Sequence, residues 1–204
     1  RKADKALYLA KEKGKNRHII YEERLHGKLE TDDMQNMAMA YAVSKEKKRE
    51  AITEMVTELC VSGVNAIVKN EERLQQIRSL FDLDGITIFS DRGNKLVCRN
   101  GNYMAEAPDG RPGFEDEKYL ALFGEDGIFV ESNMLKLRSQ NPASYAVTQE
   151  QEIGAALQCL SRKEGIPYTI VNFEVFNRNR KWSDEDITLL TLLGHCIGDL
   201  LCRF

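Results

Sequence analysis

Hydrophobic residues recur with a helical period over most of the first 81 positions of the chain. Residues 2–13 predict a helix, and the short apolar run at residues 18–21 predicts a strand. Polar residues dominate positions 22–33, which we interpret as a linker. From residue 34 to about residue 81 the helical period returns, and a polar patch at residues 69–73 is expected to break or bend this long helix.

Beyond Gly85 the pattern changes to alternating and short apolar runs, which are typical of β-strands. Residues 86–90 and 95–99 predict one hairpin. Residues 155–160 and 168–176 predict a second hairpin, because a Lys-Glu-Gly turn lies between them.

Shorter signals lie between the two hairpins. They predict a helix at residues 119–123 and a strand at residues 127–130. The Gly-, Pro- and Asp-rich residues 101–113 predict a loop, and so does the segment around Asn141-Pro142.

The chain closes with a strongly marked amphipathic helix. Ser183 is a favourable N-cap, and Asp186 at the third helical position adds an acidic group near the positive end of the helix dipole. The order of elements predicts an α+β fold in which an antiparallel sheet is flanked by N-terminal and C-terminal helices.

The composition favours an ordinary globular protein. Hydrophobic residues make up 42% and charged residues 30% of the chain. The net charge of -3 gives no basic surplus, so we expect no nucleic-acid partner. No apolar run reaches the roughly 18 residues that a membrane helix needs, so we expect no membrane segment.

The cysteines indicate a reducing compartment. The chain has an odd number, 5, and no pair has the C-x-x-C spacing of metal or redox motifs. We therefore expect a cytoplasmic protein with neither a disulfide framework nor a metal site.

The first helix and strand carry a specific motif, which consists of Ala3-Asp4-Lys5-Ala6-Leu7-Tyr8-Leu9-Ala10-Lys11 and Gly14-Lys15-Asn16-Arg17. This motif resembles the C-terminal end of GGDEF-type diguanylate cyclase domains. Because the chain starts in the middle of the helical pattern, we expect it to be part of a longer protein.

The GGDEF resemblance implies roles for two lysines in the intact parent. Lys11 and Lys15 match basic residues that contact the phosphates of GTP, which this family uses together with Mg²⁺. The acidic hairpin that holds the metal in this family is absent from the sequence. We therefore expect no cyclase activity and no cofactor in this chain, although its parent is expected to be a diguanylate cyclase.

The rest of the chain resembles a GAF domain, a PAS-related sensor fold. The clearest local feature is the hairpin that leads into Arg180-Lys181-Trp182-Ser183-Asp184-Glu185-Asp186. We predict a GGDEF remnant at residues 1–22, a linker and signalling helix at 23–49, and a GAF-like domain at 50–204.

The GAF resemblance implies a small-molecule pocket between the sheet and the segments that cover it. Its candidate lining residues are Arg99, Tyr103, Tyr119, Phe129, Glu131, Tyr145 and Gln149. Asn177-Arg178, Trp182 and Asp186 partly match the pattern of GAF domains that bind cyclic nucleotides, but Ile187 replaces the expected glutamate. His195-Cys196 has the reverse order of the pair in bilin-binding GAF domains, and helix packing explains it better.

GAF domains often dimerise through their first and last helices, so we expect a homodimer. The residues predicted to form this interface are Ile52, Val56, Leu59, Gly63, Leu190, Gly194, Ile197 and Leu201. The leading hypothesis is a non-catalytic sensor module of a bacterial cyclic di-GMP signalling protein. The alternatives are a ligand-free dimerisation scaffold and, on Cys98 alone, a methionine sulfoxide reductase.

Overall fold

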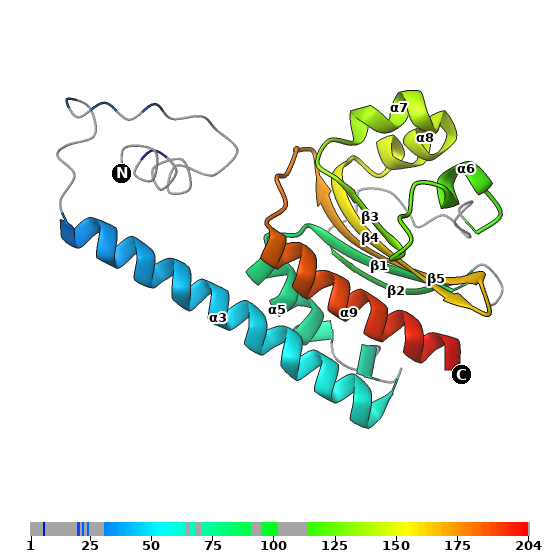
Figure 1. The fold of residues 1–204 in the computed structure, drawn as a ribbon, viewed down its shortest axis with the longest axis horizontal. Coiled ribbons are helices and arrows are strands. Elements are labelled where there is room, and N and C mark those ends of the chain that lie inside the picture. The colour runs from blue at the N-terminus through cyan, green and yellow to red at the C-terminus, as the bar shows by residue number, and fades with distance from the viewer. Residues whose placement is uncertain are drawn as a thin grey trace. The chain divides into compact units, whose positions relative to one another are not determined.

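The computed structural model describes residues 6, 20, 22, 24, 31–63, 66–67, 71–90, 95–101 and 114–203, with side chains of the long helix described from residue 39. The chain divides into two compact units, Arg1–Lys47 and Lys48–Phe204. The predicted GGDEF remnant, with Lys11 and Lys15, lies almost entirely outside the described residues. Figure 1 shows the elements of the second unit, which holds the sheet.

Over the predicted long helix the structure describes α3 (Thr31–Ser62) and α5 (Glu71–Phe81), with residues 66–67 also helical between them. The predicted interruption is therefore present, and Gly63 ends α3 ahead of the polar patch. Gly63 has a left-handed φ of 61°, and its amide donates to the Leu59 carbonyl at 2.9 Å, which is a common helix C-terminal arrangement. α3 also begins at Thr31, so the end of the predicted linker is helical.

Five antiparallel strands form the sheet in the order β2-β1-β5-β4-β3. The strands are β1 (Gly85–Ser90), β2 (Lys95–Gly101), β3 (Ile128–Glu131), β4 (Ile153–Lys163) and β5 (Ile166–Phe176). Both predicted hairpins are confirmed. The β4–β5 hairpin turns at Glu164 and Gly165, whose φ angles of 53° and 84° suit a two-residue turn.

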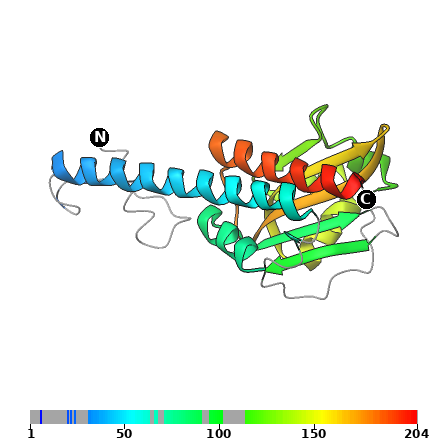
Figure 2. The ribbon, with the colours of Figure 1, turned by 90° about the horizontal axis from the view of Figure 1, so that it is seen from below.

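One face of the sheet packs against helices from both ends of the domain. The apolar side chains Ala155, Leu157 and Cys159 of β4 point to this face and join a core with α3, α5 and α9 (Asp184–Arg203). The C-terminal part of α3 runs alongside α9 (Figures 1 and 2). The α+β prediction, an antiparallel sheet with flanking helices, is confirmed.

Short helices cover the other face of the sheet, and we call them the cap. They are α6 (Glu117–Leu120), the 3-10 turn Met134–Lys136, α7 (Leu137–Gln140) and α8 (Pro142–Glu150). The predicted loop around Asn141-Pro142 is wrong. Asn141 is the N-cap of α8 and accepts a hydrogen bond from the Ser144 amide, and Pro142 occupies the first turn, where proline is tolerated.

The closing helix begins as predicted. The Asp186 amide donates to the Ser183 hydroxyl at 3.1 Å, which is the expected cap contact. Within the part of the chain that the structure describes, no helix is long and apolar enough to span a membrane.

Candidate functional site

A row of mostly polar side chains crosses the sheet on its capped face. The strand register pairs Thr87 with Arg99 and with Asn172, and it pairs Gln158 with Asn172 and with Phe129. Directly paired residues of antiparallel strands point to the same face. The row therefore contains one residue from each strand: Arg99, Thr87, Asn172, Gln158 and Phe129.

Three buried side chains in and beside this row form a hydrogen-bonded chain. The Asn172 Nδ2 group donates to the Thr87 hydroxyl at 2.7 Å and also lies 3.4 Å from the Thr87 carbonyl oxygen. The Thr87 hydroxyl in turn donates to the Glu174 carboxylate at 3.3 Å. Since Glu174 is only 2% exposed, this face contains a carboxylate almost fully removed from water.

The hydrogen-bonded chain determines the orientation of the Asn172 amide. A carbonyl oxygen only accepts hydrogen bonds, and the Thr87 hydroxyl uses its proton toward Glu174, so the NH₂ group of Asn172 must face Thr87. The Asn172 Oδ1 atom then points away from them and has no hydrogen-bond partner, although the residue is 0% exposed. An unsatisfied buried acceptor costs about 1–3 kcal/mol.

Two hydrogen bonds tie the row to segments outside the sheet. The Tyr119 hydroxyl of α6 donates to Gln158 Oε1 at 2.8 Å. At the other end of the row, Arg99 Nη2 donates to Gln151 Oε1 at 2.9 Å, just after α8. The cap is therefore bonded to the sheet through polar side chains as well as through apolar contacts.

Aromatic rings make up much of the apolar surface beside the row. The rings of Tyr119 and Phe123 meet edge to face with centroids 5.4 Å apart, and Phe123 lies 6.0 Å from Phe129. Such pairs add to the cohesion of a core beyond simple burial. The capped face thus combines flat aromatic surfaces with a line of amide, carboxylate and guanidinium groups.

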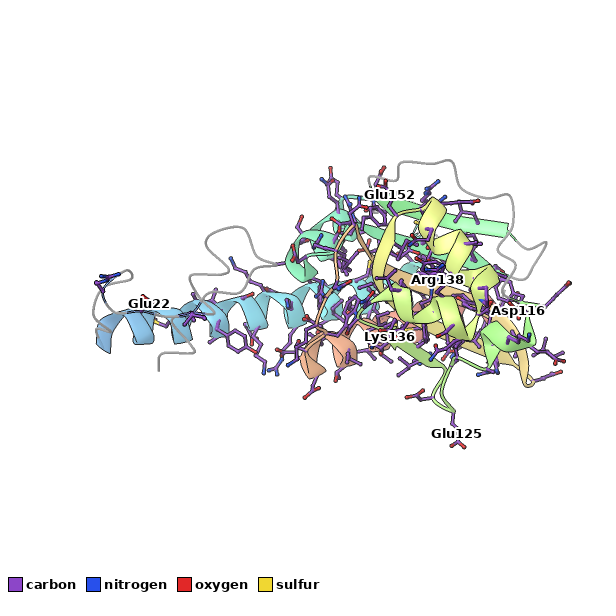
Figure 3. The ribbon with its side chains drawn as sticks, turned by 90° about the horizontal axis from the view of Figure 1, so that it is seen from above. Glu22, Asp116, Glu125, Lys136, Arg138 and Glu152 are labelled. Atoms are coloured by element: carbon purple, nitrogen blue, oxygen red, sulfur yellow. The ribbon has the colours of Figure 1, made fainter. Side chains whose placement is uncertain are left out.

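Asp116 connects the two halves of the cap. One of its oxygens accepts from the Lys118 and Tyr119 amides at the start of α6, and the other accepts from the Asn141 side chain at 3.1 Å. Asn141 itself caps α8. The hydrogen bond from Asn141, followed by those from the two amides, lowers the pKa of Asp116. Figure 3 labels Asp116 at the cap, with Lys136 and Arg138 on neighbouring cap segments.

Several predicted pocket residues lie on this face. Arg99, Tyr119 and Phe129 belong to the row or contact it, and Tyr145 packs against the same apolar core. Tyr103 lies outside the described residues.

Two predicted pocket residues lie elsewhere. Gln149 is exposed, because α8 points it away from the sheet, so its assignment to the pocket is wrong. Glu131, on the edge strand β3, accepts from the Asn133 amide and from Lys136 Nζ, so it supports a local turn.

Sequence reasoning missed four polar residues of the site. They are Thr87, Gln158, Asn172 and Glu174, and all are buried. Their signal was a polar residue at alternate positions of otherwise apolar strands. That pattern normally indicates a solvated face, and only the cap helices make it a buried one.

The residues predicted to form a dimer interface lie mainly inside the domain. Ile52, Leu59, Leu190 and Ile197 are 0% exposed in the single chain, so a second copy cannot contact them. Gly194 faces β4, where an added Cβ would lie 2.5 Å from Cys159 Sγ. Val56 and Leu201 pack partly against the same core, and Gly63 ends α3.

The residues that resemble a cyclic-nucleotide pattern contact other residues of the fold around the start of α9. Arg178 Nη1 bonds Asp84 Oδ2 at 2.6 Å, and the Trp182 ring lies 4.3 Å from the guanidinium carbon of Arg180. Asp186 bonds both Arg180, at 2.9 Å, and Lys48 of α3, at 2.6 Å. These contacts give the pattern a structural role near the start of α9.

No cysteine lies on the capped face. Cys159 and Cys196 belong to the opposite core, Cys98 packs against that core, Cys202 lies in the last turn of α9, and Cys60 is exposed on α3. Burial, followed by the charge of Glu71, raises the pKa of Cys98 to about 11. Among the residues that the structure describes, no group of His, Cys, Asp and Glu could hold a metal ion.

The fold is that of GAF domains. A cyanobacterial phytochrome GAF domain with bound phycocyanobilin is 6% identical, with a TM-score of 0.57, over 76% of this chain and 94% of that chain. The far-red-absorbing dark state of JSC1_58120g3, with bound biliverdin, is 15% identical, with a TM-score of 0.56, over 75% of this chain and 98% of that chain. GAF3 of Slr1393 from Synechocystis sp. PCC6803 is 12% identical, with a TM-score of 0.51, over 69% of this chain and 94% of that chain.

Sequence comparison identifies no relative. No protein-family model matches the chain, and no curated protein matches it. The GAF-like fold is therefore established by the structural matches, and at these identities they establish the fold alone.

Proposed function

We propose that this chain is the regulatory sensor part of a bacterial cyclic di-GMP signalling protein and that its capped face binds a small molecule. The observation that carries the proposal is the buried polar row, in which Asn172 Oδ1 has no partner. Buried polar groups are normally satisfied, so an unsatisfied acceptor beneath a helical cap supports a ligand-binding role for this face.

The cyclic di-GMP context rests on the motif at the start of the chain. The match of residues 3–17 to the end of GGDEF domains suggests that a cyclase domain precedes the sensor in the parent. Lys11 and Lys15 would contact GTP phosphates there, with Mg²⁺ held by residues outside this chain. In this form the chain is proposed to be non-catalytic.

The positions of the cysteines bear on how the proposed ligand is attached. The structurally similar GAF domains include ones with bound phycocyanobilin or biliverdin. In this chain every cysteine lies away from the capped face. We therefore propose that its ligand is bound without a covalent bond.

The high pKa of Cys98 argues against the reductase alternative. A nucleophilic thiol in such an enzyme must be available as thiolate, whereas burial and Glu71 keep Cys98 protonated at neutral pH. A sensor role needs no reactive thiol.

Native mass spectrometry of the purified chain, beside the same sample after denaturation, tests the sensor proposal directly. We expect a mass excess in the folded state that disappears on denaturation. The matched variants are Asn172→Leu, which removes the orphan acceptor, and Gln149→Leu, which changes a similar side chain at an exposed site. The excess should fall in the first variant and persist in the second.

Two results would count against the proposal. One is a bare protein mass in the wild-type chain together with no thermal stabilisation by any member of a metabolite panel, which would favour the scaffold alternative. The other is an equal cyclase rate of the restored full-length protein with and without residues 50–204, which would remove the regulatory role.

A homodimer remains a second proposal, on a face different from the predicted one. Val61 of α3 is 82% exposed and Leu192 of α9 is 49% exposed, so these side chains are available to a partner. Light scattering of the wild type and of Val61→Glu tests this proposal. A monomer in both samples would reject it, whereas a dimer lost in the variant would support it.

A further inference from the structure

The chemistry around Asn172 narrows the class of ligand, an inference that rests on the proposed sensor function. The unsatisfied atom, Asn172 Oδ1, is an acceptor, and the NH₂ group of the same side chain already donates to Thr87. A ligand that satisfies it must present a donor, which means an N–H or O–H group.

The charges on the capped face disfavour an anionic ligand at this position. Glu174 lies next to Thr87 in the hydrogen-bonded chain and is almost fully buried. A phosphate or carboxylate of the ligand near Asn172 would face this carboxylate in a poorly solvated environment, where like charges repel strongly. The guanidinium of the row belongs to Arg99, which lies across Thr87 from Asn172 and donates a hydrogen bond to Gln151.

The aromatic surface favours a flat ligand. Tyr119 touches Gln158, which is the direct cross-strand neighbour of Asn172, and Phe129 is the next residue of the row. The faces and edges of such rings pack well against another planar ring. A ring nitrogen that carries hydrogen offers the donor and the flat shape in one molecule.

We propose that the capped face recognises a small, uncharged, planar heteroaromatic molecule through an N–H group that donates to Asn172 Oδ1. Because Asn172 is 0% exposed, the ligand reaches it only when the cap moves, and the Tyr119–Gln158 hydrogen bond ties the cap to the residue paired with Asn172 on the neighbouring strand. Ligand binding and cap position are therefore coupled, as a sensor requires.

Two probes with the same ring system, one with and one without the N–H donor, test this inference. Indole has one N–H group, and 1-methylindole has the same ring without it. Titration of the whole chain, followed by NMR, should show indole binding at least about tenfold tighter, the effect of one good hydrogen bond to an otherwise unsatisfied group.

Two variants locate the effect. In Asn172→Leu the ratio of the indole affinity to the 1-methylindole affinity should fall toward one, while Thr87 can still donate to Glu174. Thr169→Val, which alters an equally buried residue of β5 on the opposite face, should keep the full preference.

Each other outcome overturns the inference. Equal affinities of the two probes in the wild type would mean that the N–H group makes no favourable hydrogen bond to the protein. An indole preference that survives in Asn172→Leu would mean that a group other than Asn172 Oδ1 accepts the hydrogen bond from the N–H group. If neither indole compound binds, the ligand class is wrong, and the mass excess in native mass spectrometry still decides the sensor proposal separately.

Discussion

At the scale of single residues, Gly194 shows how tightly α9 lies on the sheet. A Cβ added there would lie 2.5 Å from Cys159 Sγ and 2.8 Å from Cys159 Cβ. Overpacking of this kind costs about 1–3 kcal/mol, and the gain in helix propensity from glycine to alanine returns about 1 kcal/mol. We expect Gly194→Ala to lower the free energy of unfolding by up to about 2 kcal/mol in urea denaturation.

A second substitution separates packing inside the domain from packing in a dimer. Cys159→Ala removes the sulfur that the new methyl group would meet, so Gly194→Ala should cost less in that background. If the two changes are simply additive and the loss depends on protein concentration, Gly194 acts at an interface between copies.

The Cys98 thiol offers a residue-scale test of electrostatics. Its pKa is raised to about 11 by burial and then by Glu71, so its alkylation by iodoacetamide should be slow at neutral pH and quicken up to about pH 11. Exposed Cys60 should react first. Glu71→Gln should increase the alkylation rate of Cys98, whereas Glu72→Gln, at the next position of α5, should leave this rate unchanged. Equal rates in both variants would remove Glu71 as a cause.

At the scale of elements, α3 is fastened to the start of α9 by a nearly buried ion pair. Lys48 Nζ lies 2.6 Å from Asp186 Oδ1, with exposed side-chain fractions of 18% and 8%. Arg49, one residue later, bonds Glu185 with its own side chain 54% exposed. We expect Lys48→Met to cost about 1.5–3 kcal/mol of unfolding free energy and Arg49→Met less than about 1 kcal/mol.

The pH dependence of the Lys48 effect follows from Asp186. Burial alone would raise the pKa of Asp186, but the hydrogen bond and charge of Lys48, with those of Arg180, hold it below the usual value. A carboxyl whose pKa is lower in the folded than in the unfolded chain stabilises the fold fully at pH values above its unfolded pKa of about 4. This stabilisation is lost as the pH falls through the folded pKa. The difference between wild type and Lys48→Met should therefore shrink under acid. A constant difference would contradict this origin.

The elements also show what pattern reading can and cannot give. The β4–β5 hairpin was predicted because a Glu-Gly turn separates two apolar runs, whereas α8 was missed because Asn141-Pro142 serves equally as a loop or as a helix start. The site depends on register. A shift of one residue moves a strand's side chains to the other face, so sequence alone could not align Thr87 with Asn172.

At the scale of the whole molecule, the contacts assign the fold to one part of the chain. The chain divides between Lys47 and Lys48, and the first fully packed residue of the larger core is Ala51. Every hydrogen bond described above for the site lies within the second unit. This unit should therefore fold and bind its ligand without the segment that resembles a GGDEF domain.

A fragment of residues 39–204 tests this independence, because it keeps more than two helical turns before Lys48. We expect it to unfold in one cooperative transition at the same urea midpoint as the full chain, since it retains both apolar cores and the Lys48–Asp186 pair. A lower midpoint with an unchanged slope would mean that the preceding residues stabilise the sensor.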